Sequence, residues 1–279
     1  MPTVTPSVEE PSKDGVSKPR GAMLQARRWF RDDPGGSPQP TAGLFITLEG
    51  CDGTGKSTQA ALLKEWLEAE CGVEVVKTFE PGDSALGKQL RQLIQHGEEM
   101  DERTEALLFA ADRAHHVATV IRPALERGAV VICDRYSDSS VAYQGVGRKL
   151  VPAEVERISQ WATHGLRPDV TLLFDVDPEV AAARLGAPTD RIESAGQDFQ
   201  ANVRAAYLEL AAKEPERWEL IDANGTIEEI AAKVQTLIAI KIQPKNVSRE
   251  TSTPSSCAES CAQPQHGVAG SLEADRFGN

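Results

Sequence analysis

Short apolar segments alternate with longer amphipathic segments between residues 43 and 242. The apolar segments, predicted as strands, cover residues 44–49, 73–79, 129–133, 170–175 and 218–222. Most are apolar at successive positions, which is typical of strands buried on both faces of a parallel sheet. Because helical patterns lie between them, we predict an α/β fold in which helices cover both faces of a five-stranded parallel sheet.

The predicted helices have recognisable ends. The first ends near Gly72, since glycine readily adopts the left-handed conformation that stops a helix. A long helix over residues 102–127 contains Pro123, which we expect to kink it. Asp177 caps a helix that Pro178 opens, and a capping box begins the last one at Thr226. Further helices are predicted over residues 86–96, 152–164 and 196–213.

The two ends of the chain lack this periodicity. Residues 1–42 and 243–279 are rich in Pro, Ser and other polar residues, and we predict a disordered N-terminal arm and a disordered C-terminal tail. Between them, residues 43–242 form the predicted folded domain.

A glycine-rich stretch lies between the first predicted strand and the helix that follows it. This G-x-x-x-x-G-K-[ST] pattern, in that context, predicts a loop that holds the phosphates of ATP. Its backbone N–H groups and the helix N-terminus favour an anion, Lys56 reaches the β- and γ-phosphates, and Ser57 places its hydroxyl on Mg²⁺. The predicted ATP-binding residues are Gly50, Cys51, Asp52, Gly53, Thr54, Gly55, Lys56, Ser57 and Thr58.

Composition limits the partners and the compartment. The net charge of −12 argues against a surface that binds nucleic acid or anionic membrane. Five cysteines at irregular spacing do not form a disulfide framework and indicate reduced thiols. Neither a secretory signal nor an apolar run of about 18 residues is present. We therefore expect a soluble cytoplasmic protein with small-molecule ligands.

Charged residues directly follow the third predicted strand. Because the carboxyl ends of parallel strands meet at the ligand crevice, Asp134 and Arg135 are expected to lie beside the phosphate loop. Asp134 would bind Mg²⁺ through water or hold an arginine, and Arg135 would bridge two phosphates. The alternative for this pair is a surface salt bridge.

Two further clusters suit a nucleotide. Phe109 and Arg113, four residues apart on one helix face, offer a ring for stacking on a base and a guanidinium for its edge. Arg184 and the segment Asp190–Glu193 form a short connection that suits a lid over ATP. By spacing alone, a pair such as Phe109 and Arg113 is more often one core and one surface residue. The connection is by spacing as often an ordinary polar loop.

Taken in order, these motifs resemble those of bacterial thymidylate kinases, which are P-loop nucleotide kinases. The resemblance covers about residues 43–240 and rests on the phosphate loop, then Glu80-Pro81-Gly82, then Leu108-Phe109-Ala110-Ala111-Asp112-Arg113, then Asp134-Arg135-Tyr136 with Ser139–Gly145, then Asp190-Arg191-Ile192-Glu193. It implies transfer of a phosphoryl group from ATP to dTMP, with Mg²⁺, in a homodimer that serves dTTP synthesis.

The resemblance also implies a role for each matching residue. Asp52 would lie near the substrate sugar and the arginines, Arg135 would hold the acceptor phosphate, and Arg184 and Arg191 would act from the lid; together with Lys56 these are the candidate catalytic residues. The candidate dTMP-binding residues are Phe109 against thymine, Arg113 at its edge, Ser140 on its far side, Tyr143 under the sugar, Arg135, Glu80 and Pro81.

Two positions depart from the family pattern. Phe79 replaces the usual arginine before Glu-Pro-Gly, and Asp83 stands where glycine is common. Asp83 is expected to place a negative charge near the acceptor phosphate and to weaken its binding. Two alternatives follow: a P-loop kinase for another deoxynucleotide or deoxynucleoside, and a weakened nucleotide-binding scaffold that uses its tails.

Overall fold

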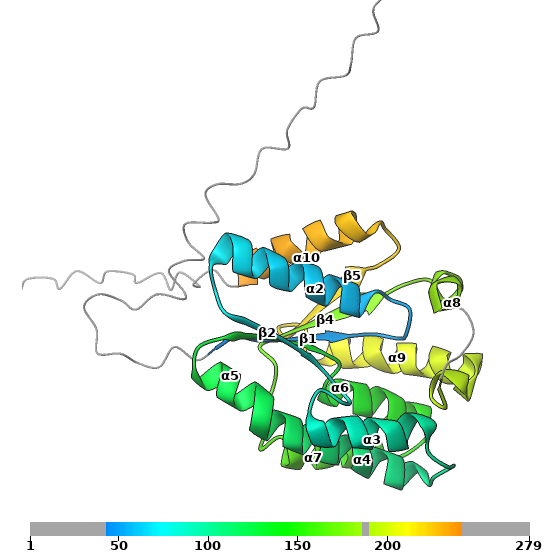
Figure 1. The fold of residues 1–279 in the computed structure, drawn as a ribbon. Coiled ribbons are helices and arrows are strands. Elements are labelled where there is room, and N and C mark those ends of the chain that lie inside the picture. Colours follow the sequence, from blue (N-terminus) through cyan, green and yellow to red (C-terminus); the bar gives the residue numbers. More distant parts are fainter. Residues whose placement is uncertain (1–42, 186–189, 242–279) are drawn as a thin grey trace, which may run out of the picture. The chain divides into compact units, whose positions relative to one another are not determined.

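A single parallel sheet organises the domain. The computed structural model describes residues 43–185 and 190–241, so the predicted arm and tail lie outside the described residues. The sheet has the order β2-β3-β1-β4-β5 (Figure 1). Its strands are β1 (Phe45–Glu49), β2 (Val75–Phe79), β3 (Val130–Asp134), β4 (Val170–Asp175) and β5 (Trp218–Asp222). The predicted α/β fold is confirmed, with β2 starting two residues later than expected.

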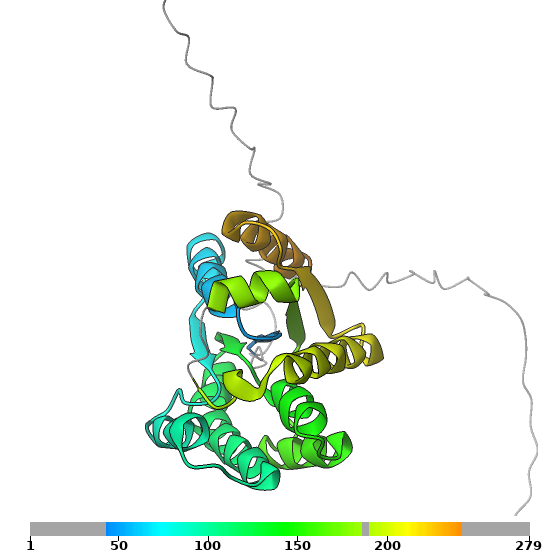
Figure 2. The same ribbon diagram turned by 90° about the vertical axis from the view of Figure 1, so that its right-hand side faces the viewer.

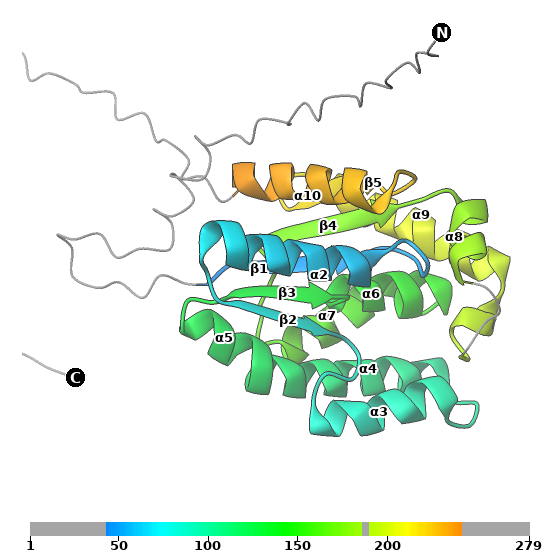
Figure 3. The same cartoon turned by 45° about the horizontal axis from the view of Figure 1, so that its top comes forward.

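The strands bury side chains on both faces because helices cover both. Alternate residues point to opposite sides, so Ile46 and Leu48 pack with Leu63 on one face, and Phe45 packs with Ile121 on the other. Helices α2 (Lys56–Trp66) and α10 (Ile227–Lys241) lie over the first face, and α5 (Arg122–Glu126) and α7 (Pro152–Ala162) lie on the opposite side (Figure 3).

Two helices begin at the caps that the sequence predicts, those of α8 and α10. Helices α3 (Ala85–His96), α4 (Glu102–His116), α8 (Pro178–Leu185) and α9 (Gln197–Lys213) are also present. The Asp177 carboxylate accepts the backbone N–H of Glu179 at 3.0 Å, which confirms the predicted cap. The capping box of α10 is also formed, since Thr226 and Glu229 accept each other's backbone N–H groups.

The long helix predicted over residues 102–127 is interrupted by a wider turn. Helix α4 continues into a π-helical turn (Val117–Ile121) before α5 begins. Pro123 is the second residue of α5, and the N–H of Arg122 bonds to the carbonyl of Val117, five residues back. Because a proline ring clashes with the carbonyl four residues before it, the wider turn relieves that clash while the helix continues.

A helical segment after β3 is absent from the sequence prediction. Helix α6 (Ser137–Ser140) and a π-helical turn (Val141–Gly147) follow the strand directly. Serine and glycine are poor helix formers, so local propensity is weak here. Tertiary packing supplies the stability: Ala142 and Tyr143 are buried against Phe199 and Val203 of α9.

The carboxyl ends of the strands meet at one edge of the sheet, where the functional residues gather. The loop after β1, the residues that follow β3 and helix α8 all lie at this edge (Figure 2). In a parallel sheet this is the edge that forms the ligand crevice. The topology therefore brings together segments that are about 80 to 130 residues apart in the chain.

The packing of α2 against the sheet generates a stability prediction. Leu63 is 1% exposed in the core between α2 and the strands. Leu63→Ala is expected to lower the free energy of unfolding by about 2–5 kcal/mol, because it removes apolar contacts and leaves a cavity. Urea unfolding followed by circular dichroism measures it. Leu220→Ala, at a position 57% exposed on β5, is the matched control and should change little; equal losses in both variants would contradict the assignment of Leu63 to the core.

Candidate active site

The loop after β1 curls around its own lysine. Gly55 has a φ of 89°, in the left-handed region, and α2 begins at the next residue. Lys56 Nζ donates to the carbonyl of Cys51 at 2.7 Å and to Thr54 Oγ1 at 3.3 Å. Burial, with the nearby Arg135 cation, lowers the pKa of Lys56, while Asp134 and Asp52 act in the opposite direction. The lysine is thus a buried cation at the N-terminus of a helix.

Ser57 and Asp134 lie side by side at the mouth of this loop. Ser57 Oγ donates to Asp134 Oδ2 at 2.5 Å, which joins the start of α2 to the end of β3. Both side chains offer oxygen atoms, the ligands that Mg²⁺ prefers. The two residues that the sequence marked for a metal are therefore adjacent and chemically suited to one.

Arg135 lies at the centre of the site. Its guanidinium pairs with Asp52 at 2.5 Å and donates to the Gly50 carbonyl at 3.1 Å and to the Tyr143 hydroxyl at 3.1 Å. Burial alone would raise the pKa of Asp52, but the Arg135 and Lys56 cations outweigh it and lower that pKa. Arg135 has a φ of 69°, an uncommon backbone conformation that a closely packed surrounding must hold in place.

Two cavities meet at Arg135. One, of about 500 Å³, is lined by Pro81, Phe109, Ser139, Ser140 and Tyr143, among others. The other, of about 370 Å³, is lined by the phosphate loop, Ser57 and Asp134. Asp52, Glu80, Arg91 and Arg135 line both. A ligand in each cavity would therefore bring its nearest groups to the same arginine.

Arg91 is a site residue that the sequence reasoning missed. It reaches from α3 to the junction of the two cavities, where it donates to the Pro81 carbonyl at 2.8 Å. Its guanidinium lies 5.7 Å from the centre of the Phe79 ring, a distance that suits a cation–π contact. Phe79, which departs from the family pattern, thus supports a second cation. No local motif marks Arg91, because only the packing of α3 against α4 brings it here.

Arg113 is buried behind the acceptor cavity. It is 1% exposed, pairs with Glu80 at 2.8 Å, and donates to Ser140, Ser159 and the Tyr136 carbonyl. It does not line the cavity. The structure thus gives it a bracing position under Glu80 and Ser140, and contact with a base edge stays a prediction.

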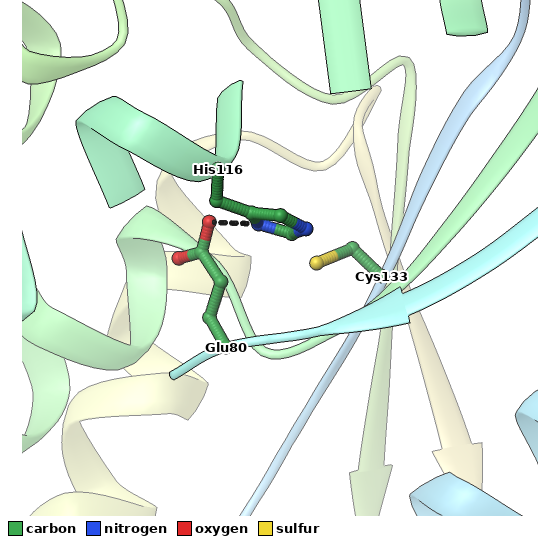
Figure 4. Close-up of side chains that lie close together, drawn as sticks. All are labelled: Glu80, His116 and Cys133. Carbon is green, nitrogen blue, oxygen red and sulfur yellow. Dashed lines mark hydrogen bonds and ion pairs between the residues drawn. The ribbon is translucent and has the colours of Figure 1, made fainter. Parts of the chain in front are cut away.

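Glu80 also joins a buried cluster with His116 and Cys133 (Figure 4). His116 Nδ1 lies 2.9 Å from Glu80 Oε1 and its Nε2 lies 2.6 Å from Thr78 Oγ1. Burial raises the pKa of the Cys133 thiol well above its usual value, and a protonated thiol is a poor metal ligand. We assign this cluster to hydrogen bonding that fixes the wall of the acceptor cavity.

Asp83 does not point its charge into the acceptor cavity. Its carboxylate accepts the Thr78 hydroxyl at 2.5 Å, and it is not among the lining residues. Thr78 in turn contacts His116 at 2.6 Å. Asp83 belongs to the hydrogen-bond network beneath the site and does not line the acceptor cavity. No contact therefore supports the expected weakening of acceptor binding.

The two candidate lid arginines are bound to different parts of the domain. Arg184 donates to the Ala223 carbonyl after β5 at 3.1 Å. Arg191 pairs with the buried Glu105 of α4 at 2.6 Å and donates to the Ile94 carbonyl. Neither lines the cavity at the phosphate loop in this structure. Their action on ATP stays a prediction.

Comparison with known proteins identifies the family. A family model described as thymidylate kinase matches residues 48–234. The chain belongs to the thymidylate kinase family. The thymidylate kinase of Leifsonia xyli subsp. xyli is 56% identical over 202 residues, 71% of this chain and 95% of the relative. That of Clavibacter sepedonicus is 57% identical over 197 residues, 69% of this chain and 93% of the relative.

A solved structure agrees with these relatives. The crystal structure of thymidylate kinase from Ehrlichia chaffeensis superimposes with a TM-score of 0.60 at 30% identity, covering 71% of this chain and 99% of that one. The predicted resemblance and the P-loop kinase fold are confirmed. The chain is thus an enzyme that phosphorylates dTMP to dTDP, and the comparisons favour neither alternative function. No helix in the described part of the chain is long and apolar enough to cross a membrane.

The burial of Glu105 generates a pH prediction. Burial would raise its pKa, but a hydrogen bond from Gln144 and the cations of Arg148 and Arg191 lower it below the ordinary 4.5. The charged form thus adds stability above pH 4.5 that is lost as the pH falls further. Glu105→Gln is expected to cost about 2 kcal/mol at neutral pH, a deficit that shrinks under acid. Unfolding measured between pH 7 and about pH 3 tests this.

Glu156→Gln, which changes an exposed residue of α7, is the control and should leave stability at neutral pH unchanged. A Glu105→Gln deficit that stays constant over the whole pH range would contradict the ion-pair account.

Proposed function

We propose that Arg135 holds the acceptor phosphate of dTMP against the γ-phosphate of ATP during phosphoryl transfer. The observation that carries the proposal is that Arg135 lines both cavities while Asp52 and Tyr143 fix its guanidinium. A fixed planar cation between two anions opposes their repulsion and aligns them. Arg91, which lines the same junction, adds a second cation.

In this proposal the donor lies over the phosphate loop. Gly50–Thr58 surround the phosphates of ATP, and Lys56 neutralises the β- and γ-phosphates from the start of α2. Ser57 and Asp134 are the residues that would hold Mg²⁺, and their adjacent oxygen atoms support it. When bound there, Mg²⁺ would supply positive charge that offsets the charge of the phosphates. When the lid closes, Arg184 and Arg191 would add positive charge beside the phosphates of ATP.

The acceptor lies in the cavity of about 500 Å³. Phe109 stacks on thymine, Ser140 contacts the far side of the base and Tyr143 packs under the sugar, where its ring leaves little room for a 2′-hydroxyl. Glu80 and Pro81 also line this cavity. Arg113 holds Glu80 and Ser140 in place from behind, and its contact with the base edge is part of the proposal.

The chemical step needs no general base. The second pKa of a phosphate monoester is about 6, so the attacking oxygen of dTMP is mostly ionised at neutral pH. Positioning and charge neutralisation are then the whole task of the protein. This agrees with the position of Arg91 and Arg135, which line both cavities.

We also infer that the enzyme acts in the cytoplasm. Cys51 and Cys133 carry free thiols, and such thiols persist in a reducing compartment.

A steady-state assay of ADP release tests the role of Arg135. Arg135→Ala is expected to lower kcat/KM for dTMP by about 10³-fold or more, because a cation at transferring phosphates carries that much, while ATP binding is retained. The parent should prefer dTMP to dUMP, dCMP, AMP and thymidine. Arg127→Ala, which removes an exposed arginine paired with Glu74, is the matched control. Normal turnover by Arg135→Ala would remove Arg135 from the mechanism.

The homodimer is proposed to form along the exposed face of α4. Leu107 is 55% exposed, Ala111 follows it one turn later on the same face, and Ala118 is exposed in the π-helical turn after α4. Small apolar residues let two helices approach closely, so a second copy of the chain fits this surface. Leu107→Arg is expected to yield a monomer by light scattering after gel filtration, and Leu220→Arg on β5 should not. A parent that is already monomeric would overturn the proposal.

A further inference from the structure

A carboxylate is buried directly before the phosphate loop. Glu49 is the last residue of β1 and is 0% exposed. Its Oε1 accepts the backbone N–H of Tyr136 at 2.8 Å, and its Oε2 accepts the hydroxyls of Ser139 at 2.6 Å and Tyr207 at 3.0 Å. A buried carboxylate in an apolar strand is costly, and these three donors offset that cost.

The same two hydroxyls also contact Arg135. Its Nη1 donates to Ser139 Oγ and to Tyr207 Oη, each at 3.3 Å. Each hydroxyl has one hydrogen and two lone pairs. If the lone pairs face Arg135, the hydrogens are free to point at Glu49, which as a carboxylate only accepts. The two hydroxyl oxygens also lie 2.8 Å apart, a spacing at which one could donate to the other. The negative charge of Glu49 favours donation to the carboxylate instead, which leaves both hydroxyl oxygens facing the guanidinium.

We propose that Glu49 is a positioning residue for phosphoryl transfer: through Ser139 and Tyr207 it fixes the Arg135 guanidinium where the two nucleotide cavities meet. Glu49 itself touches neither cavity. It also accepts the N–H of Tyr136, the residue after Arg135, and so holds the left-handed backbone at Arg135 from its other side. This inference rests on the proposed role of Arg135.

The charge of Glu49 is sensitive to pH near neutrality. Burial and the Asp138 carboxylate raise its pKa to about 7, against hydrogen bonds from Ser139 and Tyr136 and the Arg135 cation. The titratable groups that face it are Asp138, Arg135, Tyr207, Arg113 and Cys133. Protonation turns Oε2 into a donor that competes with Arg135 for the hydroxyl lone pairs. Positioning should therefore weaken as the pH falls through about 7.

Glu49→Gln is the direct test. It is expected to lower kcat/KM for dTMP by about 10²-fold, the cost of a slightly misplaced group, while KM for ATP is unchanged. The parent profile of kcat/KM for dTMP should fall below about pH 7, and the variant should keep only the fall due to the dTMP phosphate, near about pH 6. A kcat/KM for dTMP equal to that of the parent at pH 8, or an equal rise in both KM values, would overturn the inference.

Two further variants keep the result interpretable. Tyr207→Phe keeps the ring but removes one donor to the charged carboxylate, so the acid limb is expected to move to higher pH; an unmoved limb would contradict the inference. Asp169→Asn removes a carboxylate that accepts the Phe45 N–H at the other end of β1, and should leave the profile unchanged. If Arg135→Ala lowers turnover and Glu49→Gln does not, only the inference fails; if neither does, the proposed function fails.

Discussion

The ion pair between Asp52 and Arg135 is the contact on which the rest of the site depends. It joins the loop after β1 to the residue after β3, two segments that only the parallel sheet brings together. A guanidinium left unpaired at this depth would be costly. Its Nη1 and Nη2 donate to Asp52, to the Gly50 carbonyl and to the hydroxyls of Tyr143, Ser139 and Tyr207, so the cation is oriented before any nucleotide binds. Such preorganisation is how an enzyme neutralises phosphate charge without reorganising at the moment of reaction.

A buried polar layer supports that cation from below. Glu49 and Glu80 each occupy the end of a strand or the residue just after it, and each is held by several donors. Around Glu80, Arg113 and His116 connect α4 to the acceptor wall. Around Glu49, hydroxyls connect α6 and α9 to the phosphate loop. Because partly satisfied buried networks are costly, each member restricts the positions of its neighbours. The shape of the acceptor cavity thus depends in part on Arg113 and His116, which lie behind its lining residues.

Asp83 and Phe79 show how departures from a family pattern are absorbed. Taken singly, an added carboxylate and a lost arginine near the acceptor phosphate suggest a weakened enzyme. In the fold, Asp83 turns toward Thr78 and the His116 network. Phe79 offers its ring to Arg91, which lies at the cavity junction. The consequence of a substitution therefore depends on which way its side chain faces, and a linear motif does not contain that information.

The sequence alone determined the fold class, the phosphate loop and the starts of α8 and α10, because these depend on local periodicity, glycine conformations and capping groups. It also marked Asp134 and Arg135, since residues after parallel strands share one edge of the sheet. Only the tertiary structure decided that Arg91 reaches the cavity junction, that Arg113 braces the wall, and that α6 is helical despite weak propensity. These are long-range packing outcomes. Glu49 lies between the two cases: a carboxylate ending an apolar strand is visible in the sequence, but its partners Ser139 and Tyr207 are 90 and 158 residues away.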